Sequence, residues 1–285
     1  MLESDLLQPG AAALRLVHTV REIARGAGRA ILDLYEPFAG GAPLAIAHKA
    51  DDTPLTAADL AAHRFIAAAL LKLTPDIPVL SEESADVPYA LRREWRRFWL
   101  VDPLDGTKEF ISRNGEFTVN IALIEQHRPV LGVVHVPVLD RDYFGVAGMG
   151  AWRADSAVEE GVAIHVAPEL ADPLRIVGSR SHWDVALGTL LTRIGRHQMT
   201  TLGSSLKFCL LAEGCADFYP RLGPTSEWDT AAAHAVLCAA GGEVLTTDGR
   251  ALEYNRKDSL LNPSFVALSP AARQFLPLFA EVDAR

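Results

Sequence analysis

Two acidic side chains follow a strongly apolar segment near the middle of the chain. In the stretch WLVDPLDGTKEF, the first three residues predict the end of a buried strand. Asp102 and Asp105 come next, in a turn favoured by Pro103 and Gly106, because proline restricts φ and glycine permits left-handed backbone. With the Leu104 carbonyl, these carboxylates are the hard oxygen ligands that Mg²⁺ prefers. The spacing therefore indicates a divalent-cation site.

A surface turn is the simpler interpretation of this stretch, because Asp, Pro and Gly are common turn formers. Two observations favour a ligand site instead. The preceding strand is too apolar for a surface edge, and open α/β sheets bind ligands beyond the carboxyl ends of such strands. Thr107 then places a hydroxyl beside the two carboxylates.

Two other acids stand three residues after a residue that can cap a helix. Thr56 precedes Asp59 at the start of a helix expected to reach about residue 73, and Ser226 precedes Asp229 at the start of one expected to reach about residue 240. An acid at this spacing closes a capping box and favours the helix dipole, so a purely structural role remains an alternative at both positions.

Glu82 and Glu83 follow a short apolar strand around residues 79–80. Adjacent strand residues point to opposite faces, so only one of the two can face a shared site. Four acids, Glu82, Asp102, Asp105 and Asp229, thus lie at strand ends or helix starts, from which an α/β architecture directs side chains into one crevice. Together they would repel one another unless cations were bound, and Asp59 with Thr107 could then orient an attacking water.

Composition restricts the possible functions. The chain has 285 residues, 49% of them apolar, which is enough for a large core and about two lobes, predicted at residues 1–160 and 161–285. The net charge of −9 argues against nonspecific nucleic-acid binding, which depends on Lys and Arg. Three cysteines without paired spacing favour buried, reduced thiols and a cytoplasmic location. The N-terminus lacks the basic residues of a secretory signal, and no apolar run is long enough to span a membrane, although peripheral membrane contact stays possible.

The first lobe is predicted to be α+β. We expect an amphipathic helix over residues 11–35 that Pro37 ends, a short strand at 44–48, and a helix around Trp95 to Phe98 that covers the sheet. Residues 115–125, 129–138 and 142–148 alternate or are rich in β-branched side chains, which predicts an antiparallel set of strands.

The second lobe is predicted to be α/β, with alternating strands and helices from about Gly161 onward. Gly203 and Ser204 precede a helix that follows a strand, a position where backbone amides can hold a phosphate, although Gly-Ser is also a common loop sequence. Lys207 and Arg180 are the nearest cations, and either one could recognise an anionic group or simply be solvated.

Four segments taken together resemble one known family. TAAD (56–59), SEE (81–83), WLVDPLDGT (99–107) and EWDTAA (227–232) are similar to the motifs of the lithium-sensitive, Mg²⁺-dependent phosphatases of the inositol monophosphatase superfamily. Within it, GTKEFISRNGEFTVNIALI, GSSLKFCLLAEG and the closing NPSF look like the bacterial CysQ type, the 3′(2′),5′-bisphosphate nucleotidases. The likeness extends from about Leu16 to Leu268, and the residues before it look like an extension.

The resemblance implies a layered αβαβα sandwich with two or three Mg²⁺ ions between the lobes. It implies metal ligation by Glu82, Asp102, the Leu104 carbonyl, Asp105 and Asp229, water activation by Asp59 and Thr107 with a catalytic contribution from Glu82, and support behind the ligands by Glu83. It places substrate contacts at Glu82, Leu104, Asp105, Gly106, Thr107, Gly203, Ser204, Lys207 and Asp229.

The implied reaction converts adenosine 3′,5′-bisphosphate to AMP and phosphate, clearing a by-product of sulfate assimilation. Relatives that act on inositol phosphates or fructose 1,6-bisphosphate share the metal motifs, so an inositol or sugar phosphatase is the first alternative. A catalytically silent phosphate or nucleotide binder is the second. The sequence does not indicate the oligomeric state.

Overall fold

The computed structural model describes residues 10–41, 43, 46–48, 54–180 and 185–283. The α-helices are α1 (Ala11–Ala39), α2 (Ala57–Leu73), α3 (Tyr89–Arg92), α4 (Thr107–Ile111), α5 (Val185–Ile194), α6 (Leu206–Ala212), α7 (Glu227–Ala239) and α8 (Leu276–Asp283). Short 3₁₀ helices are η2 (Glu82–Ser84), η3 (Pro137–Leu139) and η4 (Pro270–Phe275). The predicted N-terminal extension lies mostly outside the described residues, as do the first two residues of the strand expected at 44–48.

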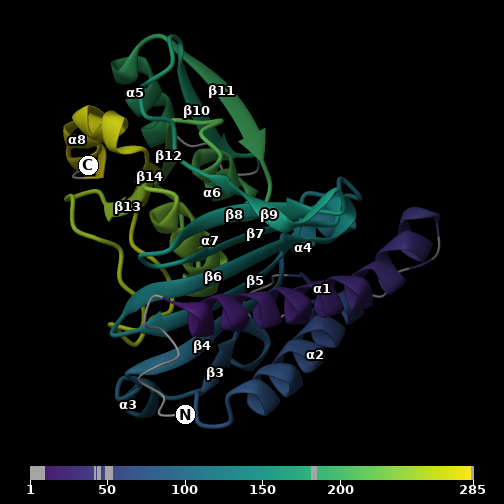
Figure 1. Cartoon of the computed structure of the whole chain (residues 1–285). Coiled ribbons are helices and arrows are strands. Elements are labelled where there is room, and N and C mark those ends of the chain that lie inside the picture. Colours follow the sequence, from purple (N-terminus) through teal and green to yellow (C-terminus); the bar gives the residue numbers. More distant parts are fainter. Residues whose placement is uncertain (1–9, 42, 44–45, 49–53, 181–184, 284–285) are drawn as a thin grey trace.

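A seven-stranded sheet forms most of the first half of the chain (Figure 1). Its strands, in spatial order, are β3 (Val79–Ser81), β4 (Arg97–Asp105), β5 (Thr118–Glu125), β6 (Arg128–Val136), β7 (Arg141–Val146), β8 (Gly150–Asp155) and β9 (Val158–Ile164). Only β3 and β4 pair in parallel, and the rest form an antiparallel meander. The three predicted antiparallel strands are confirmed as β5, β6 and β7, and two further hairpin strands extend the sheet.

The second sheet has five strands and is mixed. In spatial order they are β11 (His197–Leu202), β10 (Leu174–Ser179), β12 (Phe218–Arg221), β14 (Phe265–Leu268) and β13 (Glu243–Thr246). β10 pairs in parallel with β11 and β12, whereas β14 runs antiparallel to both of its neighbours. A separate two-stranded ribbon joins β1 (Ile46–His48) to β2 (Pro54–Thr56).

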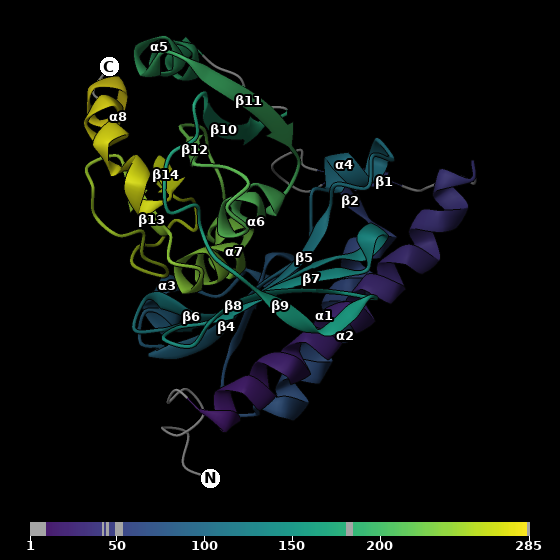
Figure 2. The same cartoon turned by 45° about the horizontal axis from the view of Figure 1, so that its top comes forward.

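The layers follow from which apolar faces are covered. One core cluster joins α1 and α2 to one face of the large sheet, a second joins the other face to α6, α7 and the small sheet, and a third lies between the small sheet, α5 and α8. Strand β4 serves both faces, because Trp99 and Val101 belong to the first cluster and Phe98 and Leu100 to the second. Figures 1 and 2 show the resulting order of helices, sheet, helices, sheet, helices, so the predicted αβαβα sandwich is confirmed.

Helix α7 packs unusually closely on the large sheet. A Cβ at Gly132 of β6 would lie 2.1 Å from the Ala232 carbonyl oxygen, and one at Gly145 of β7 would lie 2.9 Å from the Ala239 Cβ. Glycine on the sheet and alanine on the helix therefore permit this approach. The contact sets the position of the helix that begins just before Asp229.

Two local predictions are wrong. No helix covers Trp95 to Phe98: α3 ends at Arg92, and β4 begins at Arg97 because its apolar side chains pair with β5 and are buried on both faces. Helix α1 also continues through Pro37 to Ala39, where the missing proline N–H removes only one bond from the last turn. The division into lobes at residue 160 stays a prediction. Strand β9 crosses that point, and α7 from the second half packs on the large sheet of the first half.

Candidate active site

Strand β4 carries the central carboxylates, through an irregularity in its pairing. Asp102 lies opposite Asn120 and Asp105 lies opposite Thr118, so β4 has one more residue than β5 between these pairs. This β-bulge corrects the predicted turn, because Pro103 lies inside the strand, at a bulge that tolerates its missing N–H. The chain turns only at the following glycine, with φ of 96°. The bulge re-aims the side chains at the end of a buried strand.

Hydrogen bonds hold both carboxylates of β4. The Leu104 backbone N–H donates to Asp102 Oδ1 at 3.1 Å, and Asn120 Nδ2 donates to Asp105 Oδ2 at 3.1 Å. Ser205 donates in turn to Asn120 Oδ1 at 2.9 Å. Neither Asn120 nor Ser205 could be predicted from the sequence, because their role depends on the pairing of β5 with β4 and on the contact between the two halves of the chain.

The parallel partner strand brings Glu82 beside this centre. Ser81, the last residue of β3, pairs with Val101, so Glu82 begins η2 at the level of Asp102. A hydrogen bond and a Coulombic interaction with Glu82 both act on Asp102. Glu83 lies next to it in the same 3₁₀ turn, half-buried. The supporting role expected of Glu83 stays a prediction.

Asp59 serves both as a helix cap and as a site residue. It closes a capping box at the start of α2, with Oδ2 accepting from the Thr56 N–H at 2.8 Å. Its other oxygen, Oδ1, accepts from the Thr107 hydroxyl at 3.1 Å, and that hydroxyl also lies 3.4 Å from the Leu104 carbonyl oxygen. The two alternatives for Asp59 are therefore compatible, because capping uses only one of its carboxylate oxygens.

Asp229 shows the same dual use at α7. Oδ2 accepts from the Ser226 N–H at 2.9 Å in a second capping box. The Asp229 carboxyl also interacts electrostatically with Asp105 and Glu82, more than 120 residues away in the sequence. Asp105 and Asp229, from the two halves of the chain, thus line the same cavity, and their joint ligation of a metal stays a prediction.

Burial and mutual repulsion raise the pKa of three of these acids. Desolvation is the largest cause for Asp102, followed by the charges of Glu82, Asp105 and Asp229, and its pKa lies well above the ordinary value. Desolvation likewise raises the pKa of Asp229 well above normal, and that of Asp105 to about 6, although the nearby Lys207 opposes the shift at Asp105. Buried carboxyls that repel one another favour a bound cation.

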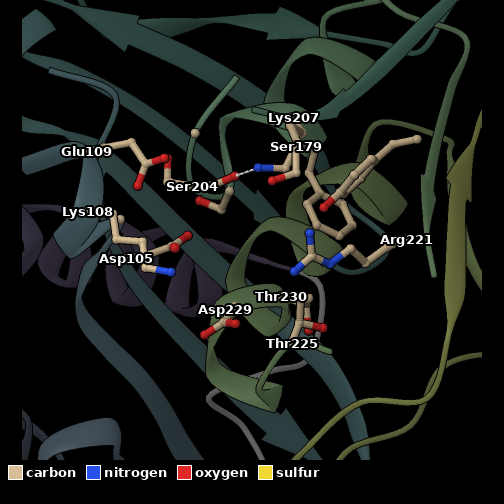
Figure 3. A pocket seen from close by; sticks show the side chains of 15 residues that line it. Asp105, Lys108, Glu109, Ser179, Ser204, Lys207, Arg221, Thr225, Asp229 and Thr230 are labelled. Carbon is tan, nitrogen blue, oxygen red and sulfur yellow. Dashed lines mark hydrogen bonds between the residues drawn. The ribbon is translucent and has the colours of Figure 1, made fainter. Parts of the chain in front are cut away.

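The opposite wall of the cavity is basic and polar. Figure 3 shows Ser204, Lys207 and the Arg221 guanidinium facing Asp105 and Asp229 across the cavity. Lys207 is only 6% exposed and donates to the backbone oxygen of Leu202 at 3.3 Å and to that of Ser204. Burial lowers the pKa of Lys207 to about 8. Ser204 Oγ and Arg221 Nε are buried without a hydrogen-bond partner among the described residues.

The two cations predicted near the Gly203–Ser204 turn, Lys207 and Arg180, have different positions in the structure. Lys207 lines the cavity, as do Gly106, Gly203 and Ser204, which were expected to contact substrate. Arg180 instead pairs with Glu116 at 2.6 Å. Arg221, which the sequence analysis missed, takes the place beside Lys207. Only the pairing of β12 in the small sheet could have placed it there.

The donor set suits a hard divalent cation. Four carboxylates and the Leu104 carbonyl are all oxygen donors, and the pKa of Asp102 shows that the acids repel one another. Within the part of the chain that the structure describes, no three His, Cys, Asp or Glu side chains are drawn together tightly enough to form a finished metal site.

The profile of the Inositol monophosphatase family matches residues 15–281. This match covers most of the chain, which therefore belongs to that family. The 3′(2′),5′-bisphosphate nucleotidase CysQ of Salmonella typhimurium is 52% identical over 250 residues, covering 88% of this chain and 98% of that protein. CysQ of Escherichia coli K12 is 51% identical over 251 residues, covering 88% of this chain and 98% of that protein.

Solved structures agree with the fold. The crystal structure of CysQ from Bacteroides thetaiotaomicron, a bacterial member of the inositol monophosphatase family, superposes with a TM-score of 0.77. It is 42% identical, and the match covers 90% of this chain and 97% of that one. The family predicted from four short segments is thereby confirmed.

No described helix is long and apolar enough to cross a membrane.

Proposed function

We propose that this chain is a Mg²⁺-dependent 3′(2′),5′-bisphosphate nucleotidase that converts adenosine 3′,5′-bisphosphate to AMP and phosphate. The single observation that carries the proposal is the cavity with two chemically opposite walls. One wall gathers carboxylates that suit divalent cations, and the other presents Lys207, Arg221 and the Ser204 hydroxyl. A substrate with two phosphates can place one at each wall. The names of the relatives agree with this assignment.

The carboxylate wall of the cavity would bind the metal ions. Glu82, Asp102, the Leu104 carbonyl, Asp105 and Asp229 would hold two or three Mg²⁺ ions. Divalent cations, when bound, neutralise phosphate oxygens and activate the attacking water. They also account for how a chain of net charge −9 can accept an anionic substrate.

The hydroxyl of Thr107 orients the water and passes a proton toward Asp59. Its donation to Asp59 Oδ1 at 3.1 Å leaves the oxygen lone pairs of Thr107 available to accept a hydrogen bond from that water. Asp59 is only 2% exposed and is held by the start of α2, so its geometry is set before substrate binds. We place Gly106, Gly203 and Ser204 around the phosphates.

Lys207 and Arg221 recognise the second phosphate. Both are largely buried, and a charged partner in such a site contributes more binding energy than one in water.

We place the enzyme in the cytoplasm, where sulfate assimilation produces this substrate, and free thiols support that location. Of the three cysteines only Cys209 is buried, so the prediction of burial is wrong for Cys215 and Cys238.

A substrate panel tests the proposal. We expect Mg²⁺-dependent phosphate release from adenosine 3′,5′-bisphosphate with kcat/KM at least tenfold above that for inositol 1-phosphate, and inhibition by Li⁺. Lys207→Ala and Arg221→Ala should each raise KM for the bisphosphate, by tenfold or more, since each charged hydrogen bond contributes about 1.5–3 kcal/mol. A tenfold preference for inositol 1-phosphate in the unaltered enzyme would instead assign the chain to the inositol phosphatases.

A further inference from the structure

Glu116 links the two halves of the chain at the rim of the cavity. It lies just before β5, and both of its carboxylate oxygens accept bonds from the second half. The Arg180 guanidinium donates to Oε1 at 2.6 Å, and the Gly203 backbone N–H donates to Oε2 at 2.8 Å. The Glu116 side chain is 21% exposed, and that of Arg180 is 48% exposed. The Glu116 carboxylate therefore binds the Gly203–Ser204 turn, which lines the cavity, and Arg180 neutralises its charge.

The turn that Glu116 holds is conformationally restricted. Ser204 has a φ of 44°, in the left-handed region that residues with a Cβ rarely adopt. Gly203 has no room for a side chain, because a Cβ there would lie 2.4 Å from Glu109 Cγ and 2.9 Å from the Glu116 carbonyl oxygen. Such a backbone persists only where its surroundings enforce it, and the hydrogen bond from Gly203 to Glu116 is one of those constraints.

The same turn organises the groups that face the substrate. The Leu202 and Ser204 carbonyl oxygens accept bonds from the Lys207 ammonium, and the Ser204 hydroxyl is buried with no partner among the described residues. Any movement of the turn would thus displace both a hydroxyl and an ammonium that line the cavity. Glu82 and Asp102 belong to other elements, and Asp105 keeps its bond from Asn120 of β5, so the turn reaches the carboxylates only through the adjoining Ser205.

We propose that Glu116 is a positioning residue that sets specificity for the second phosphate of the substrate. It holds the Gly203–Ser204 turn so that Ser204 and Lys207 meet that phosphate, and Arg180 cancels the charge that would otherwise repel it. The proposal rests on the proposed function for the identity of the substrate. Glu116 acts through the turn and touches no reacting atom, so it should affect binding of the bisphosphate and leave the chemical step unchanged.

Steady-state kinetics of Glu116→Ala and Glu116→Gln test this role. For adenosine 3′,5′-bisphosphate we expect Glu116→Ala to raise KM about tenfold, or about 1.4 kcal/mol, with kcat within twofold of the unaltered enzyme. Glu116→Gln should raise KM about threefold, because its neutral amide oxygen accepts from the Gly203 N–H more weakly than a carboxylate does. For adenosine 3′-phosphate, which lacks the second phosphate, kcat/KM should change less than twofold in both variants.

Glu243→Ala is the matched control. Glu243 forms a comparable two-point ion pair with Arg273, at 2.8 Å for one of its contacts, on the small sheet away from the cavity. It should leave both kinetic constants unchanged. The proposal is overturned if the Glu116 variants lose kcat at constant KM, or lose activity equally toward the bisphosphate and the monophosphate.

Two further measurements distinguish failure of the role of Glu116 from misfolding of a variant and from a wrong substrate assignment. Thermal unfolding reports whether Glu116→Ala is folded, and the nearly isosteric Glu116→Gln decides the outcome if it is not. Failure of the proposed function is seen in the unaltered enzyme, as a preference for inositol 1-phosphate. An unaltered enzyme that prefers the bisphosphate, combined with unchanged KM in Glu116→Gln and Glu116→Ala, refutes only the role of Glu116.

Discussion

Two buried aspartates on the same sheet have opposite surroundings. Asp142 on β7 is 0% exposed, and Asp102 on β4 is 1% exposed. Arg21 and Arg25 from α1 donate to Asp142 Oδ2 at 3.1 and 2.8 Å, and His135 Nδ1 lies 2.8 Å from its Oδ1. Burial alone would raise the pKa of Asp142, but these hydrogen bonds and charges outweigh it and the pKa falls below the ordinary value.

Among the described residues, no cation compensates the charge of Asp102. Its neighbours are the acids Glu82, Asp105 and Asp229, which add to the effect of burial and raise its pKa. The comparison teaches that a structural charge is buried with its counterions on neighbouring elements, whereas the charges of a cation site repel one another until the ligand arrives. For these two aspartates the neighbouring charges, and not burial, make the difference.

The same substitution at both positions should therefore have opposite effects, and the largest is on activity. Asp102→Asn should lower kcat/KM for adenosine 3′,5′-bisphosphate by at least the roughly 10²–10³-fold that follows loss of one electrostatic group at a reacting centre. The asparagine oxygen can still accept from the Leu104 N–H, so the fold should remain. Phosphate release checks the first expectation, and thermal unfolding in EDTA checks the second. Retained Mg²⁺-dependent turnover would remove Asp102 from the metal site.

Asp142→Asn should reverse this pattern. It leaves Arg21 buried without its carboxylate, which typically costs about 3–5 kcal/mol. We expect a clearly lower midpoint in urea unfolding and a kcat/KM per folded molecule within about twofold of the unaltered enzyme. A variant as stable as the original would mean that the ion pairs around Asp142 contribute little, and the comparison would then rest on Asp102 alone.

The smallest effect is on the pH dependence of stability. The folded-state pKa of Asp105 is about 6, above its ordinary value of 3.8, so between these values the folded chain binds more protons than the unfolded one. In EDTA, unfolding free energy should accordingly fall as pH rises through this window, by roughly 1–3 kcal/mol. Asp142 has the opposite sign: its contribution is present above its ordinary pKa and lost as pH falls through its lowered one.

Adding Mg²⁺ should change the pH dependence of the unfolding free energy. Binding to the deprotonated carboxylates should stabilise the chain near pH 7 and weaken or reverse its loss of stability between pH 4 and 6. Asp105→Asn provides the control, since it removes one of the titrating groups. Urea unfolding at several pH values, with EDTA or with Mg²⁺, gives both slopes. Identical slopes with and without Mg²⁺ would argue against cation binding by these acids.

Much of the site could be predicted from the sequence because its signals are local. The capping boxes at Thr56 and Ser226 depend on a spacing of three residues, and the Asp-Pro-Leu-Asp-Gly segment marks where a buried strand ends beside the cavity. Apolar periodicity predicted α1, and the Ser226 cap predicted α7, each to within a few residues. Residue type and short spacing determine hydrogen bonding within one turn, so these features need no knowledge of the rest of the chain.

Other features were decided only by tertiary structure. The bulge in β4 exists because of its register with β5. The place of Arg221 in the cavity follows from the small sheet, and Glu116 reaches Gly203 across the two halves. A sequence displays a charge but not its neighbours. Because the electrostatic state of a buried group is set by groups far along the chain, only the folded structure distinguishes Asp102, whose charged neighbours are acids, from Asp142, whose charged neighbours are Arg21, Arg25 and His135.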